Sequence, residues 1–312
     1  MTLWCIAVNA AIDKMYIVPR FRAGTEYRLD RAVAVAGGKA LNVAKTARLL
    51  GVEDVVCTGF IGGRTGAWIQ RDLADRGIRT DFIEVPGESR ENVLIADPTG
   101  APETRLVEPG DPVDSAAADE LLAHLRQRVC PGDLVVVAGS LRPGLPARLY
   151  GELVTLARGA RARVFVDADA DALRSAAAER PDLVAPNEAE FGAWAGREAH
   201  GLPGLARLAR EVSGGATVIV TLGARGAVRV DAQEACFASA PAVTVLSTVG
   251  SGDALLGGYA AATLRGAPAA EALVLGVAAG AANTLSPGPG VVEPDVVEQL
   301  RRRVTIQTIE IG

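Results

Sequence analysis

The residues best suited to chemistry lie within residues 245–258. There Gly250-Ser251-Gly252-Asp253 separates a short apolar run from an Ala- and Leu-rich segment, which predicts a strand end at 243–246, a tight turn and a helix over 253–264. The two glycines let the backbone approach a ligand without a Cβ in the way, so several N–H groups at the helix start can point at one anion. The pattern therefore predicts a phosphate-binding turn. Asp253 fits either a charge placed favourably in the helix dipole or a carboxylate that acts on the bound group.

A second glycine pair opens another helix near the start of the chain. Residues 37–42, Gly-Gly-Lys-Ala-Leu-Asn, lead into a predicted helix that runs through residue 50. This is not a P-loop, which would need Gly at Val33 and Ser or Thr at Ala40. Only three of the 32 basic residues are lysines, so a lysine at this helix start is a less routine choice than usual. Two interpretations stay open: an anion site with Lys39 and Asn42 in its first turn, or a tight turn with a solvated lysine.

The overall composition predicts a globular chain without a nucleic-acid or membrane-surface partner. The chain has 312 residues, 49% of them hydrophobic, and a formal net charge of −5, whereas such partners need concentrated positive charge. The N-terminus lacks the basic region and apolar core of a signal peptide, so we expect a cytoplasmic protein. No cysteine lies in a Cys-x-x-Cys pair, and we expect buried free thiols rather than metal ligands.

Apolar runs and helical segments alternate along most of the chain. We predict strands at 3–8, 55–60, 80–85, 133–138, 163–167, 182–185, 217–221 and 227–230. We predict further helices at 65–76, 114–128, 146–158, 169–178 and 268–283. Such alternation is typical of a layered, mostly parallel sheet. A period-two pattern at 25–35 and two short strands at 92–96 and 104–107 interrupt it and predict a small β lid.

Polar side chains follow several of the predicted strands. Asp13, Ser140 and the pair Asn187 and Glu190 each come just past a strand. The carboxyl ends of parallel strands share one sheet edge, where open α/β sheets bind ligands, so these groups should converge. Asp13 is then either a loop-capping residue or the partner of a substrate hydroxyl. A glycine-bracketed turn at 222–226 is either a seat for adenine and its ribose or an ordinary hairpin turn.

Four of these motifs, in their order and spacing, resemble the signatures of the ribokinase-like sugar kinases, also called the phosphofructokinase-B family. The matching segments are 37–42, 186–190, 221–226 and 248–253, with Ser251 where alanine is usual. The resemblance runs from Asn9 to about Gly290. It implies one ribokinase-like α/β domain over residues 1–312, with a three-layer α/β/α architecture, a mostly parallel central sheet, and a β lid contributed by about 12–35 and 90–108.

Segments 87–92 and 138–144 resemble the family members that accept an already phosphorylated hexose. This resemblance implies a substrate site made of Asp13, Gly37, Gly38, Lys39, Asn42, Arg90 and Ser140. Of these, Lys39, Asn42, Arg90 and Ser140 would hold the existing phosphate, since a dianion suits cations and neutral donors. Because family lids often form dimer interfaces, we expect a homodimer through the lid. Arg28 is then either a surface residue or a contact to the partner subunit's sugar phosphate.

The branch within these members follows from two further resemblances. Lys39 after the glycine pair resembles the 1-phosphofructokinase and tagatose-6-phosphate kinase branch, which we favour; fructose 1-phosphate or tagatose 6-phosphate is then the substrate and a bisphosphate the product. Thr104-Arg105-Leu106-Val107 is closer to the minor 6-phosphofructokinase, which is the alternative activity.

The resemblance also implies the transfer chemistry. Asp253 accepts a proton from the sugar hydroxyl as that oxygen attacks the γ-phosphorus of ATP, and the amides of Gly250, Ser251 and Gly252 stabilise the charge. Mg²⁺ bridges the phosphates and is held through water by Asn187 and Glu190. The implied nucleotide contacts are Asn187, Thr221, Gly223, Gly226 and Asn283.

Departures from the family pattern leave other readings open. Ala185 stands where phosphohexose kinases often have lysine, and Asp167-Ala168-Asp169 replaces a more usual stretch, so the donor preference stays open. A nicotinamide-dependent dehydrogenase would need a glycine at Leu255. A non-catalytic sugar-phosphate sensor would not need the intact Gly-Ser-Gly-Asp turn.

Overall fold

The computed structural model describes residues 1–29, 32–99 and 102–310. Strands in one group are β1 (Leu3–Ala7), β4 (Val55–Ile61), β5 (Arg79–Glu84), β8 (Leu134–Gly139), β9 (Arg163–Ala168), β10 (Leu183–Val184), β11 (Thr217–Thr221), β12 (Gly226–Val230), β13 (Ala235–Ser239) and β14 (Thr305–Thr308). Strands in the other are β2 (Ala11–Ile17), β3 (Ala32–Gly37), β6 (Arg90–Ala96) and β7 (Thr104–Val107). The helices are α1 (Lys39–Leu49), α2 (Gly63–Asp75), α3 (Ala116–Arg126), α4 (Arg148–Gly159), α5 (Ala170–Ala178), α6 (Glu188–Ala195), α7 (Gly201–Val212), α8 (Ser251–Leu264), α9 (Ala269–Asn283) and α10 (Pro294–Arg301).

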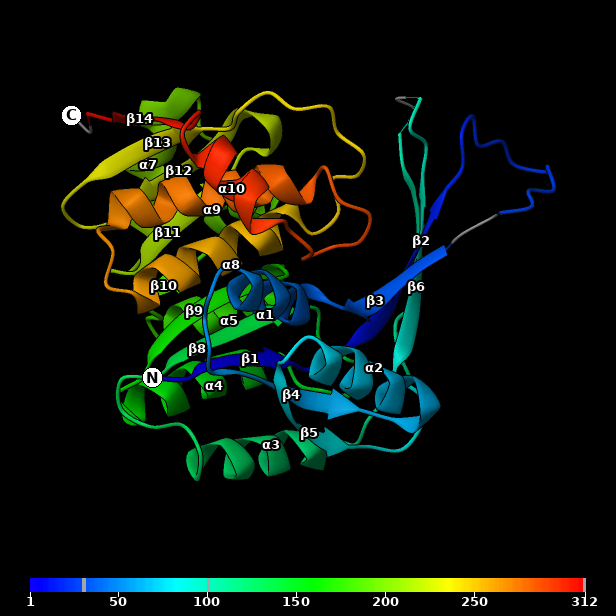
Figure 1. The fold of residues 1–312 in the computed structure, drawn as a ribbon. Coiled ribbons are helices and arrows are strands. Elements are labelled where there is room, and N and C mark those ends of the chain that lie inside the picture. The colour runs from blue at the N-terminus through cyan, green and yellow to red at the C-terminus, as the bar shows by residue number, and fades with distance from the viewer. Residues whose placement is uncertain (30–31, 100–101, 311–312) are drawn as a thin grey trace.

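Within those ranges the strands form two sheets, a large one in the body of the molecule and a small one beside it (Figure 1). The large sheet has ten strands in the order β14-β13-β12-β11-β10-β9-β8-β1-β4-β5, and the small sheet has four in the order β3-β2-β6-β7. We call the large sheet with its helices the body, and the small sheet with its connecting loops the lid. β1 pairs in parallel with both β4 and β8, whereas β12, β13 and β14 add an antiparallel edge.

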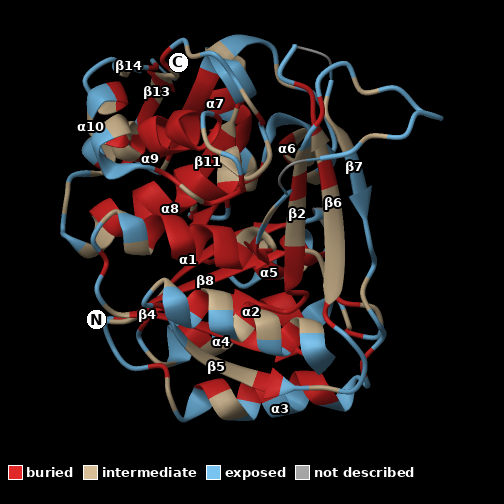
Figure 2. Ribbon diagram, turned by 45° about the vertical axis from the view of Figure 1, so that its right-hand side comes forward, coloured by how far each residue is buried: buried red, intermediate tan, exposed pale blue. Residues whose placement is uncertain are grey.

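The large sheet separates two hydrophobic clusters. Along β1, Trp4 and Ile6 pack into a cluster that includes residues of α3, α4 and α5, whereas Leu3 and Cys5 pack into one that includes residues of α1, α8 and α9. This alternation follows from the two-residue period of a strand. Central strands such as β8 are buried along their whole length and are therefore continuous apolar runs (Figure 2). The three-layer α/β/α fold with a mostly parallel sheet is confirmed.

The lid is built differently from the sequence prediction. β2 lies between β3, with which it is antiparallel, and β6, with which it is parallel, while β7 pairs antiparallel with β6. The predicted strand at 25–35 is wrong for residues 25–29, which form no strand, and residues 30–31 lie outside the described part. There the Tyr27 hydroxyl accepts from the Arg22 amide and donates to the Arg20 carbonyl, so this segment folds onto its own loop. The predicted hairpin strands β6 and β7 are confirmed.

Three other expectations need correction. Residues 243–246 form no strand; instead the amides of Leu246 and Ser247 donate to the carbonyl of Thr284, so the chain enters α8 from an irregular loop. The edge strands β13 and β14 were not predicted. Cys5, Cys57 and Cys236 are buried free thiols as expected, but Cys130 is exposed. In the described part of the chain, no helix combines the length and apolar character that a membrane span requires.

Candidate active site

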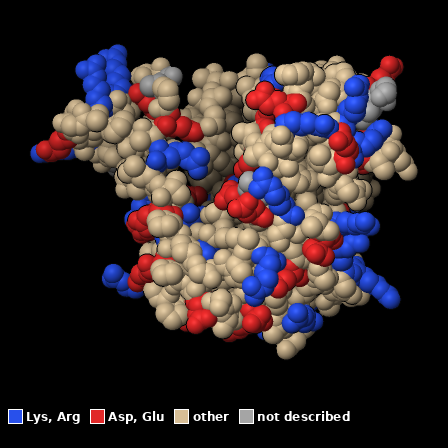
Figure 3. All heavy atoms as spheres, turned by 180° about the vertical axis from the view of Figure 1, so that it is seen from behind, with Lys and Arg blue, Asp and Glu red and all other residues tan. Residues whose placement is uncertain are grey.

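A cleft of about 760 Å³ lies between the lid and the carboxyl ends of the body strands. Its walls include Ala7 at the end of β1, Gly139 at the end of β8, Asp167 in β9 and Thr221 at the end of β11. Lid strands β2, β6 and β7 form the facing wall, and the first turn of α8 closes one end. The molecule is hollowed between lid and body when seen from behind (Figure 3). Polar groups that follow the body strands therefore converge at the sheet edge where they were expected, but Asp13, predicted there too, reaches the cleft from lid strand β2 instead.

The first turn of α8 presents main-chain donors to the cleft. Gly250 is the N-cap with φ +80°, and a Cβ there would lie 2.6 Å from Cβ of Pro289, so both conformation and space require glycine. The Ser251 amide donates to the Thr248 carbonyl at 3.2 Å. The amides of Gly252 and Asp253 have no acceptor among the described residues, as is usual for a first helical turn. Gly250, Ser251, Gly252 and Asp253 all line the cleft.

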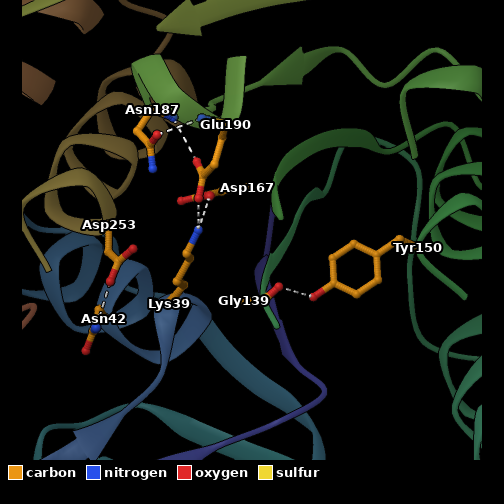
Figure 4. A network of polar contacts seen from close by, with 8 residues as sticks. All are labelled: Lys39, Asn42, Gly139, Tyr150, Asp167, Asn187, Glu190 and Asp253. Atoms are coloured by element: carbon orange, nitrogen blue, oxygen red, sulfur yellow. Dashed lines mark hydrogen bonds and ion pairs between the residues drawn. The ribbon is translucent and has the colours of Figure 1, made fainter. Parts of the chain in front are cut away.

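Asp253 is a buried carboxylate whose pKa is poised near neutrality. Only 8% of the residue is exposed, and its Oδ2 accepts a hydrogen bond of 2.7 Å from Asn42 Nδ2 (Figure 4). Burial and the nearby charge of Asp167 raise its pKa to about 7, against the opposing effects of the Lys39 cation and the Asn42 hydrogen bond. Such a carboxylate is suited to accept a proton at physiological pH.

Lys39 lies in the first turn of α1 and points at two carboxylates. Its Nζ lies 2.7 Å from Oδ1 of Asp167 and 3.3 Å from Oε1 of Glu190 (Figure 4). Burial alone would lower its pKa, but the charges of Asp167, Glu190 and Asp253 outweigh burial and raise the pKa above its ordinary value. Lys39 is therefore a permanent cation at the centre of an acidic cluster. The sequence resemblance expects it at a sugar phosphate, whereas here its partners are carboxylates.

The Asn-x-x-Glu motif forms the N-terminal cap of α6. Asn187 Oδ1 accepts from the Glu190 amide at 2.9 Å, and Glu190 Oε2 accepts from the Asn187 amide at 2.8 Å. This reciprocal pair is a capping box, which fixes both side chains at the rim of the cleft. Two atoms of these side chains are directed away from the cap. They are Asn187 Nδ2 and Glu190 Oε1, and the latter accepts a hydrogen bond from Lys39. The motif therefore positions an amide and a carboxylate together.

Asp13 of β2 and Arg90 of β6 reach the cleft from the lid. Asp13 accepts from Asn92 Nδ2 at 2.7 Å, and Gly37 packs so closely under its carboxylate that a Cβ there would lie 2.1 Å from Oδ2. Arg90 donates to the carbonyls of Asn9 and Glu108 at 3.3 and 2.9 Å, which fixes its guanidinium against the lid.

Ser140 and Arg105 also line the cleft. Ser140 follows Gly139, whose carbonyl accepts from the buried Tyr150 hydroxyl at 2.8 Å (Figure 4). Arg105 of β7 also lines the cleft, from a position opposite Leu94, four residues along β6 from Arg90. The cleft thus combines arginine side chains with neutral donors.

These elements and this geometry can be compared with known proteins. Residues 5–295 match the family described as pfkB family carbohydrate kinase. The chain belongs to this family. A pfkB kinase of similar sequence, the 1-phosphofructokinase of Rhodobacter capsulatus, is 38% identical over 307 residues, covering 97% of both chains.

Solved structures agree with this assignment. Escherichia coli phosphofructokinase-2, solved in complex with substrates and products, superposes with a TM-score of 0.90 at 28% identity, over 97% of this chain and 99% of that one. Ribokinase from Thermotoga maritima shares the fold, with a TM-score of 0.73 at 21% identity over 96% and 99% of the two chains. As a pfkB kinase, the chain is an ATP-dependent sugar kinase, and its phosphofructokinase relatives place its activity among the sugar-phosphate kinases.

Most residues predicted from the pfkB signatures line the cleft. These are Asp13, Gly38, Lys39, Asn42, Arg90, Ser140, Asn187, Glu190, Thr221, Gly223, Gly250, Ser251, Gly252 and Asp253. Gly37 lies behind Asp13. Arg28 lies outside the cleft, with 94% of its side chain exposed and Glu26 as its ion-pair partner, so it contacts no part of its own chain's site.

Gly226 and Asn283 are placed differently from the expected nucleotide contacts. Neither lines the cleft. A Cβ at Gly226 would lie 2.0 Å from the Ala238 carbonyl, so this glycine serves the close pairing of β12 with β13. The buried Asn283 amide donates to the Val249 carbonyl at 2.8 Å and accepts from the Gly290 amide at 2.7 Å, behind the first turn of α8. Both residues support the cleft from outside it.

Several cleft residues were missed by the sequence interpretation. They are Asn9, Lys14, Asn92, Arg105, Asp169, Glu188 and Thr248. Arg105 lies in a segment that the resemblance had singled out, and Asn92 ends the segment that begins at Gly87, so a signal was present for both. Asp167 was noted only as a departure from the family pattern, yet it pairs with Lys39 at the centre of the site.

Proposed function

We propose that this kinase transfers the γ-phosphoryl group of ATP to a hydroxyl of a phosphorylated ketohexose, with fructose 1-phosphate as the preferred acceptor. The observation that carries the proposal is the buried Asp253, with a pKa of about 7, beside the unpaired amides of Gly252 and Asp253 in a cleft that Arg90 and Arg105 also line. A base, an anion site and further cations in one cleft suit an acceptor that already carries a phosphate. Support also comes from the relatives named 1-phosphofructokinase.

In the proposed reaction, Asp253 accepts the proton of the acceptor hydroxyl while that oxygen forms a bond to the γ-phosphorus. The bond from the γ-phosphorus to the bridging oxygen of ADP breaks, and the amides of Gly250, Gly252 and Asp253 stabilise the charge on the transferring group. Asn42 holds the Asp253 carboxylate in place through its 2.7 Å hydrogen bond. Phosphoryl transfer depends mainly on alignment and charge stabilisation, so these groups suffice on the protein side.

The existing phosphate of the acceptor is assigned to Arg90, Arg105 and Ser140. An arginine fork recognises a phosphate bidentately, and the Ser140 hydroxyl adds a neutral donor. Asp13, held by Asn92, is placed to bind a sugar hydroxyl. Lys39 is assigned to the transferring phosphoryl group rather than to the sugar phosphate. It forms ion pairs with Asp167 and Glu190, and the charge of Asp253 also acts on it, so it lies close to the proposed base.

Mg²⁺ fits the donor set of Asn187 and Glu190 only through water and nucleotide phosphates. Within the described residues, no group of three or more His, Cys, Asp or Glu side chains is arranged to hold a metal unaided. Mg²⁺ retains much of its hydration and commonly binds through one or two carboxylates plus substrate phosphates. When bound, the ion would neutralise charge on the phosphates. Thr221 and Gly223 line the cleft beside Asn187 and are assigned to the nucleotide.

A panel of acceptors tests the proposed specificity. Fructose 1-phosphate, fructose 6-phosphate, tagatose 6-phosphate and the unphosphorylated hexoses would each be supplied with ATP and Mg²⁺, and ADP release measured. We expect the highest kcat/KM with fructose 1-phosphate. Preference for fructose 6-phosphate would instead support the 6-phosphofructokinase activity that the segment at Arg105 resembles. Sugar-phosphate binding without turnover would indicate a sensor.

The position of Arg90 in the cleft predicts how its removal changes KM for the phosphosugar. Removing one charged hydrogen-bond partner of a phosphate costs about 2–4 kcal/mol, so Arg90→Ala should raise KM for the phosphosugar by about 30- to 1000-fold, with a smaller effect on kcat. Arg148→Ala, on α4 outside the cleft, is the matched control and should leave KM unchanged. An unaltered KM in Arg90→Ala would place the sugar phosphate elsewhere.

We also propose a homodimer through the lid, in which Arg28 approaches the partner subunit's site. Support comes from large hydrophobic side chains that the lid exposes outside the cleft: Ile17, Leu29 and Leu106 are 38%, 40% and 59% exposed. Exposed apolar side chains gathered on one element often mark an interface. The cytoplasmic location stays a prediction from the N-terminal sequence.

A further inference from the structure

Lys45 is a buried lysine that the proposed reaction does not use. It lies in α1, is 1% exposed, and its Nζ donates hydrogen bonds of 2.6 Å to the carbonyls of Ala36 and Pro289. Burying an ammonium group costs free energy unless partners compensate, and an apolar side chain of the same length would avoid that cost. A specific role for its two contacts is therefore expected.

The first contact fixes the base of the lid. Ala36 lies near the end of β3, and both of its backbone polar groups are bonded. Its amide donates to Asp72 Oδ2 at 2.9 Å, and its carbonyl accepts from Lys45. The next residue, Gly37, packs directly under the Asp13 carboxylate. Lys45 therefore anchors the backbone on which a sugar-facing carboxylate rests.

The second contact fixes the loop behind the first turn of α8. Pro289 packs against Gly250, where a Cβ would lie 2.6 Å from the Pro289 side chain. Gly290 packs against Asn42, the partner of Asp253, so closely that a Cβ at Gly290 would lie 2.6 Å from the Asn42 Cα. The loop at 289–290 thus touches both the phosphate-binding turn and the residue that holds the base.

Two neighbours complete the attachment of this loop. Thr46, adjacent to Lys45, donates from Oγ1 to the Gly290 carbonyl at 3.2 Å. On the other side, Asn283 joins the Gly290 amide to the Val249 carbonyl just before Gly250. Because every contact involves main-chain atoms of a glycine- and proline-containing loop, the side chains of α1 and α9 determine where the loop lies.

We propose that Lys45 is a positioning residue that joins the base of the lid to the loop at 289–290 and thereby holds the phosphate-binding turn, Asn42 and Asp13 in register. The inference rests on the proposed function for its kinetic consequence, but not for its structural one. The charged groups that act on the Lys45 ammonium are Asp13 of β2, Asp72 of α2, Arg76 just after α2, and Asp253 of α8. Burial lowers the pKa of Lys45 to about 8, so it is mostly protonated at neutral pH.

The test compares Lys45→Met with a matched variant. Methionine preserves length and removes both donors, so the loop and the β3 end should lose their attachment. Because a displacement of about 1 Å can cost on the order of a hundredfold in rate, we expect kcat to fall by about a hundredfold, with KM for fructose 1-phosphate changed by less than about threefold. Amide hydrogen exchange, measured by mass spectrometry, should accelerate by at least about tenfold in peptides covering 34–38 and 286–291.

Leu125→Ala supplies the control. Leu125 is fully buried in α3, on the opposite face of the sheet, so its truncation lowers stability without touching the loop. Its kcat and the exchange of both peptides should stay at the wild-type level. A folded Lys45→Met protein that keeps kcat within about threefold of wild type, or whose loop exchange is unchanged, would overturn the proposal.

A second variant covers the case in which Lys45→Met does not fold. Thr46→Val removes one attachment of the same loop at lower cost, and we expect kcat to fall by about three- to tenfold with faster exchange at 286–291. Unchanged exchange and kcat in Thr46→Val would refute the role of this attachment. If the wild-type protein phosphorylates no sugar, the proposed function fails, whereas the exchange measurements still decide whether Lys45 holds the loop.

Discussion

Replacing Asn42 by alanine should move the pH dependence of the reaction. Asn42 Nδ2 donates a 2.7 Å hydrogen bond to Asp253 Oδ2, and both side chains are buried. A hydrogen bond to a charged group contributes about 1.5–3 kcal/mol, and about 1.36 kcal/mol corresponds to one pH unit. Because this bond favours the ionised carboxylate, its loss makes the proton harder to remove. We expect the acidic limb of kcat/KM to move about 1–2 pH units to higher pH.

The assay is the profile of kcat/KM against pH, with the phosphosugar as the varied substrate. In the wild-type enzyme, burial and Asp167 hold the pKa of Asp253 at about 7, so the acidic limb should lie near neutrality. At pH 7 the Asn42→Ala enzyme should be slower by about five- to fiftyfold, and its rate should recover largely by about pH 9.5. Any titration of the substrate phosphate is common to both enzymes and cancels in the comparison.

Asn92→Ala is the matched control. It removes a 2.7 Å hydrogen bond of the same kind, but to Asp13 rather than to Asp253. We expect it to raise KM for the phosphosugar and to leave the acidic limb in place. If Asn42→Ala raised KM alone, with its acidic limb unmoved, Asn42 would bind the sugar phosphate as the sequence resemblance implies, and the reasoning about the base would be refuted.

Four further predictions concern the base, the lid and the assembly. Asp253→Asn should lower kcat by about a thousandfold or more with little change in KM, and retained turnover would remove Asp253 from the base role. The same variant should be more stable than wild type at pH 8, by on the order of 4 kcal/mol, but little more stable at pH 4, because a carboxyl pKa raised from 3.8 to about 7 on folding destabilises the wild-type fold progressively between about pH 4 and pH 7; thermal unfolding would measure this. Glu103, next to β7, accepts hydrogen bonds from the hydroxyls of Ser247 and Thr248 at 2.8 and 2.5 Å, just before the α8 turn. Because Glu103→Ala removes both bonds, it should lower kcat by about tenfold with KM nearly constant. A wild-type kcat in steady-state kinetics would contradict this. Leu106→Glu should halve the molar mass seen by light scattering, because it places a charge in the proposed lid interface; a dimer of undiminished mass would locate that interface elsewhere.

The sequence was sufficient for the fold class and for most of the cleft. Short apolar runs alternating with helical segments predicted a mostly parallel sheet, and β7 was predicted at its observed bounds. The strand predicted at 25–35 is right over 32–35, which lie in β3, but wrong over 25–29, because alternation alone cannot distinguish a strand from a loop that binds its own backbone, as Tyr27 does. β14 was missed because its pairing with β13 joins residues about 70 positions apart, and register at that separation is set by tertiary packing.

The directions of the side chains in the site were harder to predict from the sequence. Lys39 was singled out by its place after two glycines, but its partners come from β9 and α6, 128 and 151 residues further along the chain. The spacing of Asn187 and Glu190 could have revealed the capping box, since asparagine three residues before glutamate at a helix start is a local signal. The pKa of Asp253 had no such signal, because it depends on burial and on Asp167 in space.

The three lysines show how a rare residue type can indicate a site. Lys14 and Lys39 line the cleft, and Lys45 lies directly behind it, whereas the remaining basic residues of this chain are arginines. An ammonium group is compact and donates in any direction, while a guanidinium is a planar fork that needs more room. Lys39, whose side chain is 29% exposed, must fit between two carboxylates, and the buried Lys45 between two carbonyls. The same reasoning that drew attention to Lys39 in the sequence therefore applies to Lys45, whose role only the packing of the loop at 289–290 could reveal.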